Sequence, residues 1–60
     1  MGMRGLEAAI LRELREVTGN RKLRQKDIQE WTTGDIKPVE GEMVVYLPTL
    51  HINVAYKVAS

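Results

Sequence analysis

Side chains that commonly carry enzyme chemistry are few in this chain of 60 residues. It contains no cysteine and a single histidine, His51. A disulfide and the usual Cys/His zinc site are therefore excluded. His51 lies in a segment that alternates as a strand does, with no acid or hydroxyl at a spacing typical of a nucleophile–base pair. We predict that it is a surface residue of that strand.

The carboxylates and glycines show no catalytic arrangement either. The acids of the C-terminal half are spread over several expected elements, and no two of them are marked as an acid–base pair. The five glycines form neither a Walker loop nor a GxGxxG motif. We therefore predict a non-enzymatic protein that uses no cofactor and no metal.

A basic run is the strongest functional pattern in the chain. Four of the six residues from 21 to 26 are cationic: Arg21, Lys22, Arg24 and Lys26. Such a run could contact phosphates, with help from Arg12 or Arg15, or it could be a solvated charged surface. Residues 1–26 contain seven basic and three acidic side chains, whereas residues 27–60 contain two and five. The acidic half would repel a nucleic acid that wrapped the domain, so nucleic-acid binding is our second hypothesis.

The segment Leu23–Trp31 resembles the second helix of helix-turn-helix DNA-binding proteins. In that family a recognition helix follows directly. Here residues 33–41 contain Gly34, Pro38 and Gly41, which interrupt a helix. The chain departs from the family's pattern where the base contacts should be.

Two helices are expected in the N-terminal half. One apolar stripe at steps of three and four predicts an amphipathic helix over residues 3–17, ended by Thr18-Gly19-Asn20; the stripe is Met3, Leu6, Ile10, Leu14 and Val17. Residues 22–32 contain good helix formers with Ile28 and Trp31 on one face. They predict a second, shorter helix capped by Asn20 or Asp27.

The C-terminal half changes to a period of two. Residues 50–58 alternate as a strand with one buried face, and Glu42–Leu47 is rich in β-formers. We predict a hairpin through Pro48-Thr49, widened to four residues because Pro48 suits a two-residue turn poorly. In this register Val45 lies opposite Ile52, and Tyr46 lies opposite His51.

Together these elements predict one small α+β domain over residues 1–60. We expect two layers, in which both helices pack on a C-terminal antiparallel hairpin or small sheet. A chain this short is marginally stable, so a partner surface could contribute to its stability. No apolar run is long enough to cross a membrane and no secretory segment is visible, so we expect a cytoplasmic protein.

The sheet face turned away from the helices is the predicted interaction site. It contains Val44, Tyr46, His51 and Asn53, together with Ala55, and so carries few charges. That composition is typical of the centre of a protein interface. We therefore predict a protein-interaction module that uses this face or the exposed edge of the hairpin, with an unidentified protein or a second copy as partner.

Overall fold

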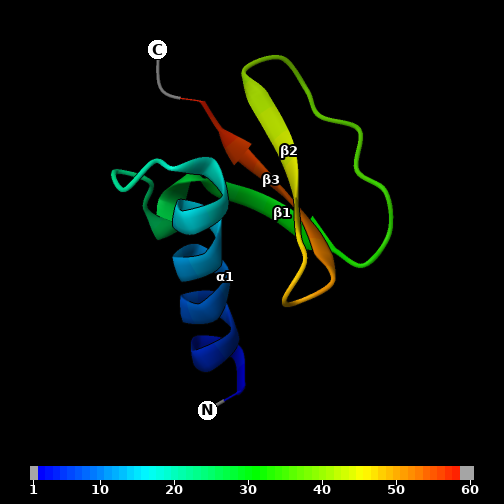
Figure 1. Ribbon diagram of the computed structural model, residues 1–60. Coiled ribbons are helices and arrows are strands. Elements are labelled where there is room, and N and C mark those ends of the chain that lie inside the picture. The colour runs from blue at the N-terminus through cyan, green and yellow to red at the C-terminus, as the bar shows by residue number, and fades with distance from the viewer. Residues whose placement is uncertain (1, 59–60) are drawn as a thin grey trace.

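A computed structural model describes the backbone of residues 2–58 and the side chains of residues 5–58. The elements follow in the order α1 (Gly2–Thr18), a single 3₁₀ turn η1 (Gln25–Asp27), β1 (Ile28–Thr32), β2 (Glu42–Leu47) and β3 (Ile52–Lys57). The three strands form an antiparallel sheet of order β1-β3-β2, so β3 is central and β1 and β2 are its edges (Figure 1). The predicted α+β class is confirmed.

The first helix forms as the apolar stripe predicts. Ile10 and Leu14 are buried and Leu6 is half-buried, whereas Val17 at the last turn is 44% exposed. The side chain of Met3 lies outside the described residues. Gly19 has a φ of +73° and donates its N–H to the carbonyl of Arg15 at 2.9 Å, which closes the last turn in the left-handed conformation that glycine adopts freely.

The predicted second helix over residues 22–32 is wrong. Only η1 is helical, and it is closed by Asp27, whose carboxylate accepts the N–H of Arg24 at 2.9 Å. Ile28 is then already extended, with φ −77° and ψ 119°. The segment continues as strand β1 because backbone hydrogen bonds to the central strand β3 outweigh the helix propensity of its residues, a weak determinant that tertiary context overrides.

A bulge in β1 explains why its pattern resembles a helix. Ile28 pairs with Tyr56 and Trp31 pairs with Val54, and the pairing shifts between residues 28 and 30. The extra residue of a bulge changes the alternation of side chains. Ile28 and Trp31, three residues apart, therefore both pack against the core. The same spacing would place them on one face of a helix.

The β2–β3 hairpin forms with the predicted faces but in a register shifted by two residues. Leu47 pairs with Ile52, Val45 with Val54 and Tyr46 with Asn53. The loop is residues 48–51, and its last residue, His51, has a φ of +57°. Its N–H bonds to the carbonyl of Leu47 at 2.8 Å. A shift of two keeps the side chains of β2 and β3 on their predicted faces because strands alternate with a period of two. Leu50 and His51, predicted as the start of the strand, lie in the loop instead.

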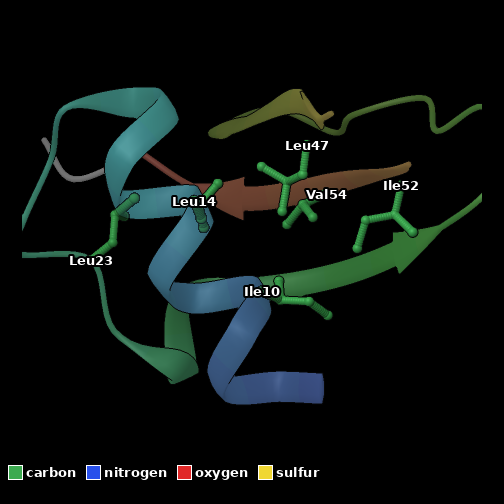
Figure 2. Packing of buried hydrophobic residues seen from close by; sticks show 6 residues of the cluster. All are labelled: Ile10, Leu14, Leu23, Leu47, Ile52 and Val54. Atoms are coloured by element: carbon green, nitrogen blue, oxygen red, sulfur yellow. The ribbon is translucent and has the colours of Figure 1, made fainter. Parts of the chain in front are cut away.

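The core lies between α1 and one face of the sheet. Figure 2 shows Ile10 and Leu14 of α1 beside strand residues, with Leu23 entering from the segment that follows α1. The buried cluster is Ile10, Leu14, Leu23, Leu47, Ile52 and Val54. Two polar contacts attach α1 to the segment that follows it and to the hairpin loop. Arg15 Nε donates to the carbonyl of Leu23 at 2.8 Å, and the Thr49 N–H donates to Glu13 Oε2 at 2.9 Å.

The chain between β1 and β2 passes over the sheet on the side opposite α1. Both edge strands run antiparallel to β3 and are therefore parallel to each other. Residues 33–41 must then return from the end of β1 to the start of β2, along the length of the sheet (Figure 1). Asn53, whose side chain is on that face, donates its amide to the carbonyl of Gly34 at 2.7 Å. Ala55 on the same face is only 1% exposed. The outer face is therefore partly covered by the protein's own chain.

Candidate interaction surface

The backbone of β2 has one side bonded to β3 and one side free. The N–H of Val58 donates to the carbonyl of its partner Gly41 at 3.0 Å. Hydrogen-bonded and non-hydrogen-bonded pairs alternate along an antiparallel ladder, so Met43, Val45 and Leu47 direct their backbone groups toward β3. Val44 and Tyr46 direct theirs to the open edge. In the part of the chain that the structure describes, no bond outside the β2–β3 ladder uses these groups.

Tyr46 and His51 come together, although not as a cross-strand pair. Tyr46 is 49% exposed on the outer face of β2, and its hydroxyl lies 3.1 Å from Nδ1 of His51. The prediction that they lie opposite one another is wrong, because Asn53 occupies the position opposite Tyr46. His51 reaches the hydroxyl from the hairpin loop, where its left-handed backbone is a conformation for which histidine is enriched among non-glycine residues.

Val44 and Asn53 are less available than the sequence suggests. Val44 is half-buried opposite Ala55. Asn53 is also half-buried, and its amide is bonded to Gly34. An amide that holds the β1–β2 connection is a structural group, so the accessible part of the predicted site is Tyr46 and the backbone edge of β2. We call the backbone edge at Val44 and Tyr46, together with the side chains of Tyr46 and His51, the β2 edge surface.

Sequence reasoning missed the apolar end of the sheet. Met43 and Val58 are 52% and 49% exposed on the helix-facing side, and Val39 before β2 is 64% exposed. The alternation correctly places Met43 and Val58 on the face that α1 packs against. Whether α1 reaches that end of the face is decided by where the helix crosses the sheet, and periodicity contains no information on that crossing.

The basic segment forms an exposed turn with η1 rather than a helix. Its four cations are all exposed: Arg21, Lys22, Arg24 and Lys26. The turn is fixed by polar contacts, since the Lys22 N–H donates to Asn20 Oδ1 at 2.9 Å and the Asn20 N–H donates to Thr18 Oγ1 at 3.2 Å. Of the four cations, Arg21 alone lines the groove described next.

Arg21 lines a groove together with two arginines of α1. The groove has a volume of about 810 Å³ and lies between the C-terminal half of α1 and the turn after it. It is lined by Ala8, Leu11, Arg12, Arg15, Glu16, Gly19, Arg21 and Gln25. Arg15 is held in place by its bond to Leu23. Three cations against one carboxylate give the groove a positive balance. Lys22, Arg24 and Lys26 are not part of it.

Comparisons with known proteins add no assignment. No family model, curated protein or solved structure matches this chain. Among the described residues, no three side chains of His, Cys, Asp or Glu are grouped as a metal ion requires. Within the same residues, no helix combines the length and the apolar character needed to cross a membrane.

Proposed function

We propose that this protein is a non-enzymatic interaction module that binds another polypeptide by accepting a strand at the edge of β2. In this proposal the domain is two-layered, with α1 on one face of the sheet and the β2 edge surface at the open side. The backbone groups of Val44 and Tyr46 supply affinity. The side chains of Tyr46 and His51 supply selectivity, as side-chain contacts do in other cases of strand addition.

The observation that carries this proposal is the regular, unblocked edge of β2. Natural proteins protect edge strands with bulges, prolines or charged side chains, because free N–H and C=O groups recruit other strands. β2 has no bulge in its pairing with β3, and the run from Met43 to Leu47 contains neither proline nor charge. The half-exposed Tyr46 beside this edge is a residue type enriched in interface centres.

Tyr46→Lys tests the proposal, because a lysine on an edge strand opposes strand addition. Affinity capture with parent and variant, followed by identification of the bound proteins, should show a specific partner with the parent and none with Tyr46→Lys. Thr33→Lys is the control, since Thr33 is exposed on the connection rather than on β2. Circular dichroism should show the same fold for all three chains. A variant that captures the same partner as the parent would overturn the proposal.

A second candidate function, nucleic-acid binding, is favoured by the groove that joins Arg21 with Arg12 and Arg15. Phosphate binding by cations releases counterions, so removing one phosphate-binding cation should flatten the plot of log affinity against log salt by about 0.9. Arg12→Gln with Arg21→Gln should flatten the plot by about 2 for duplex DNA, and Lys57→Gln on the opposite half of the chain should leave it unchanged. Absence of binding at low salt to duplex and single strands would eliminate this candidate.

A further inference from the structure

We propose that the strand accepted by β2 is β2 of a second copy of this chain, in an antiparallel pairing centred on Val45. This inference rests on the proposed function and names its partner. The two sheets would join into one continuous antiparallel sheet. Both α1 helices would lie on the same face of it, because opposed residues in an antiparallel pair share a face.

The available hydrogen-bonding groups favour a pairing centred on Val45 over a pairing centred on Val44. Around Val45, Val44 lies opposite Tyr46 of the second copy, and each such pair exchanges both N–H···O bonds. These are the two residues whose backbone groups face the open edge. A pairing centred on Val44 would instead need the N–H of Glu42, which already donates to the carbonyl of Val39 at 3.0 Å.

The side chains are self-complementary in the same register. On the outer face Val44 meets Tyr46, which is a favourable aliphatic–aromatic cross-strand pair. On the helix-facing side Val45 meets Val45, and the 52% exposed Met43 lies opposite Leu47. No charged residue lies within the run from Met43 to Leu47, so two copies bring no like charges together across the seam.

Pairing at β2 would also cover two of the exposed apolar side chains, Met43 and Tyr46. Burial of apolar surface is the main favourable term in most protein–protein association, so this coverage favours the dimer.

Single cysteines test the register directly, since the chain has none of its own. Val45 would face its own copy in a non-hydrogen-bonded pair with Cα atoms ~4.5 Å apart, which a disulfide can bridge. Val45→Cys should therefore form a covalent dimer under mild oxidation. Val44→Cys is the matched control, because its copy lies two residues out of register, beyond the ~7 Å limit. Mixing Val44→Cys with Tyr46→Cys should restore the crosslink.

Sedimentation of the parent over a range of concentrations completes the test. A concentration-dependent dimer that Val44→Pro abolishes supports the proposal, because proline removes an edge-facing N–H without removing a bond to β3. A parent that stays monomeric, or a crosslink through Val44→Cys alone, overturns it. If the parent is monomeric yet captures a different protein that Tyr46→Lys loses, self-pairing fails and the proposed function stands. If that capture is also absent, both fail.

Discussion

The two edges of the sheet, β1 and β2, differ in how open they are to another strand. β1 has five residues, a shift in its pairing between Ile28 and Glu30, and a glutamine whose side chain amide reaches back to the carbonyls of Lys26 and Asp27 at 3.4 and 3.3 Å. β2 has six residues paired without interruption. Bulges and charges protect edges from association. The comparison shows that β2 is the more regular of the two edges, which is why the proposed strand addition is placed there.

The largest effect is expected from the central strand, on which both edges depend. Ile52→Ala removes a side chain that is 5% exposed and leaves a cavity, so it should lower the free energy of unfolding by about 2–5 kcal/mol, comparable to the whole stability of a small domain. Met43→Ala, on the same sheet face but 52% exposed, should cost far less. Denaturant titrations of both variants check this, and equal midpoints would contradict the core described above.

An aromatic residue on each edge strand provides the sharpest comparison of the two edges. Trp31 packs against the core from β1, so Trp31→Ala should cost about 3 kcal/mol, the lower end of the range for large aromatic truncations because the ring is only half-buried. In dilute protein, Tyr46→Ala on β2 should change stability by under about 1 kcal/mol, because the ring is 49% exposed. Thermal melts measure both. If Tyr46→Ala proved the more destabilising, the assignment of roles to the edges would be reversed.

The side-chain amide of Asn53 should contribute less to stability, by holding the connection between β1 and β2 on the sheet. Asn53→Ala removes its bond to the carbonyl of Gly34, worth about 1 kcal/mol. Hydrogen exchange of residues 33–41 should become faster, since this bond attaches the connection to the sheet. Lys57→Ala, on the same face of β3 but exposed, is the control. Unchanged exchange in the connection would show that Asn53 does not hold it.

The smallest expected effect needs no substitution. In dilute protein the amide hydrogens of Val44 and Tyr46 should exchange with solvent faster than that of Val45, which bonds to β3. Strand addition at the edge should then slow the first two selectively, as concentration rises or a partner is added. Residue-resolved exchange by NMR measures this alternation. Equal rates for all three amides would contradict the assignment of Val45 to the side bonded to β3 and of Val44 and Tyr46 to the open edge.

Some parts of this molecule are determined by short-range sequence alone. The apolar stripe that includes Ile10 and Leu14 is sufficient to predict α1, and Gly19 is sufficient to predict its end, because both depend on neighbours within one or two turns. Alternation likewise predicts β3 and the faces of the residues in β2 and β3, although not that Leu50 and His51 lie in the loop. The candidate residue Tyr46 was correctly placed on the outer face for this reason.

Other parts were decided by tertiary structure. Residues 28–32 became a strand because β3 had a second row of backbone groups to satisfy, and local sequence does not contain that demand. The two-residue shift of the hairpin depends on the left-handed backbone of His51, which ends a four-residue loop one position later than expected. The pairing of β1 also decides which strand is the open one. It covers the second side of β3, so the edges of the sheet are β1, which contains a bulge, and β2, which pairs without interruption.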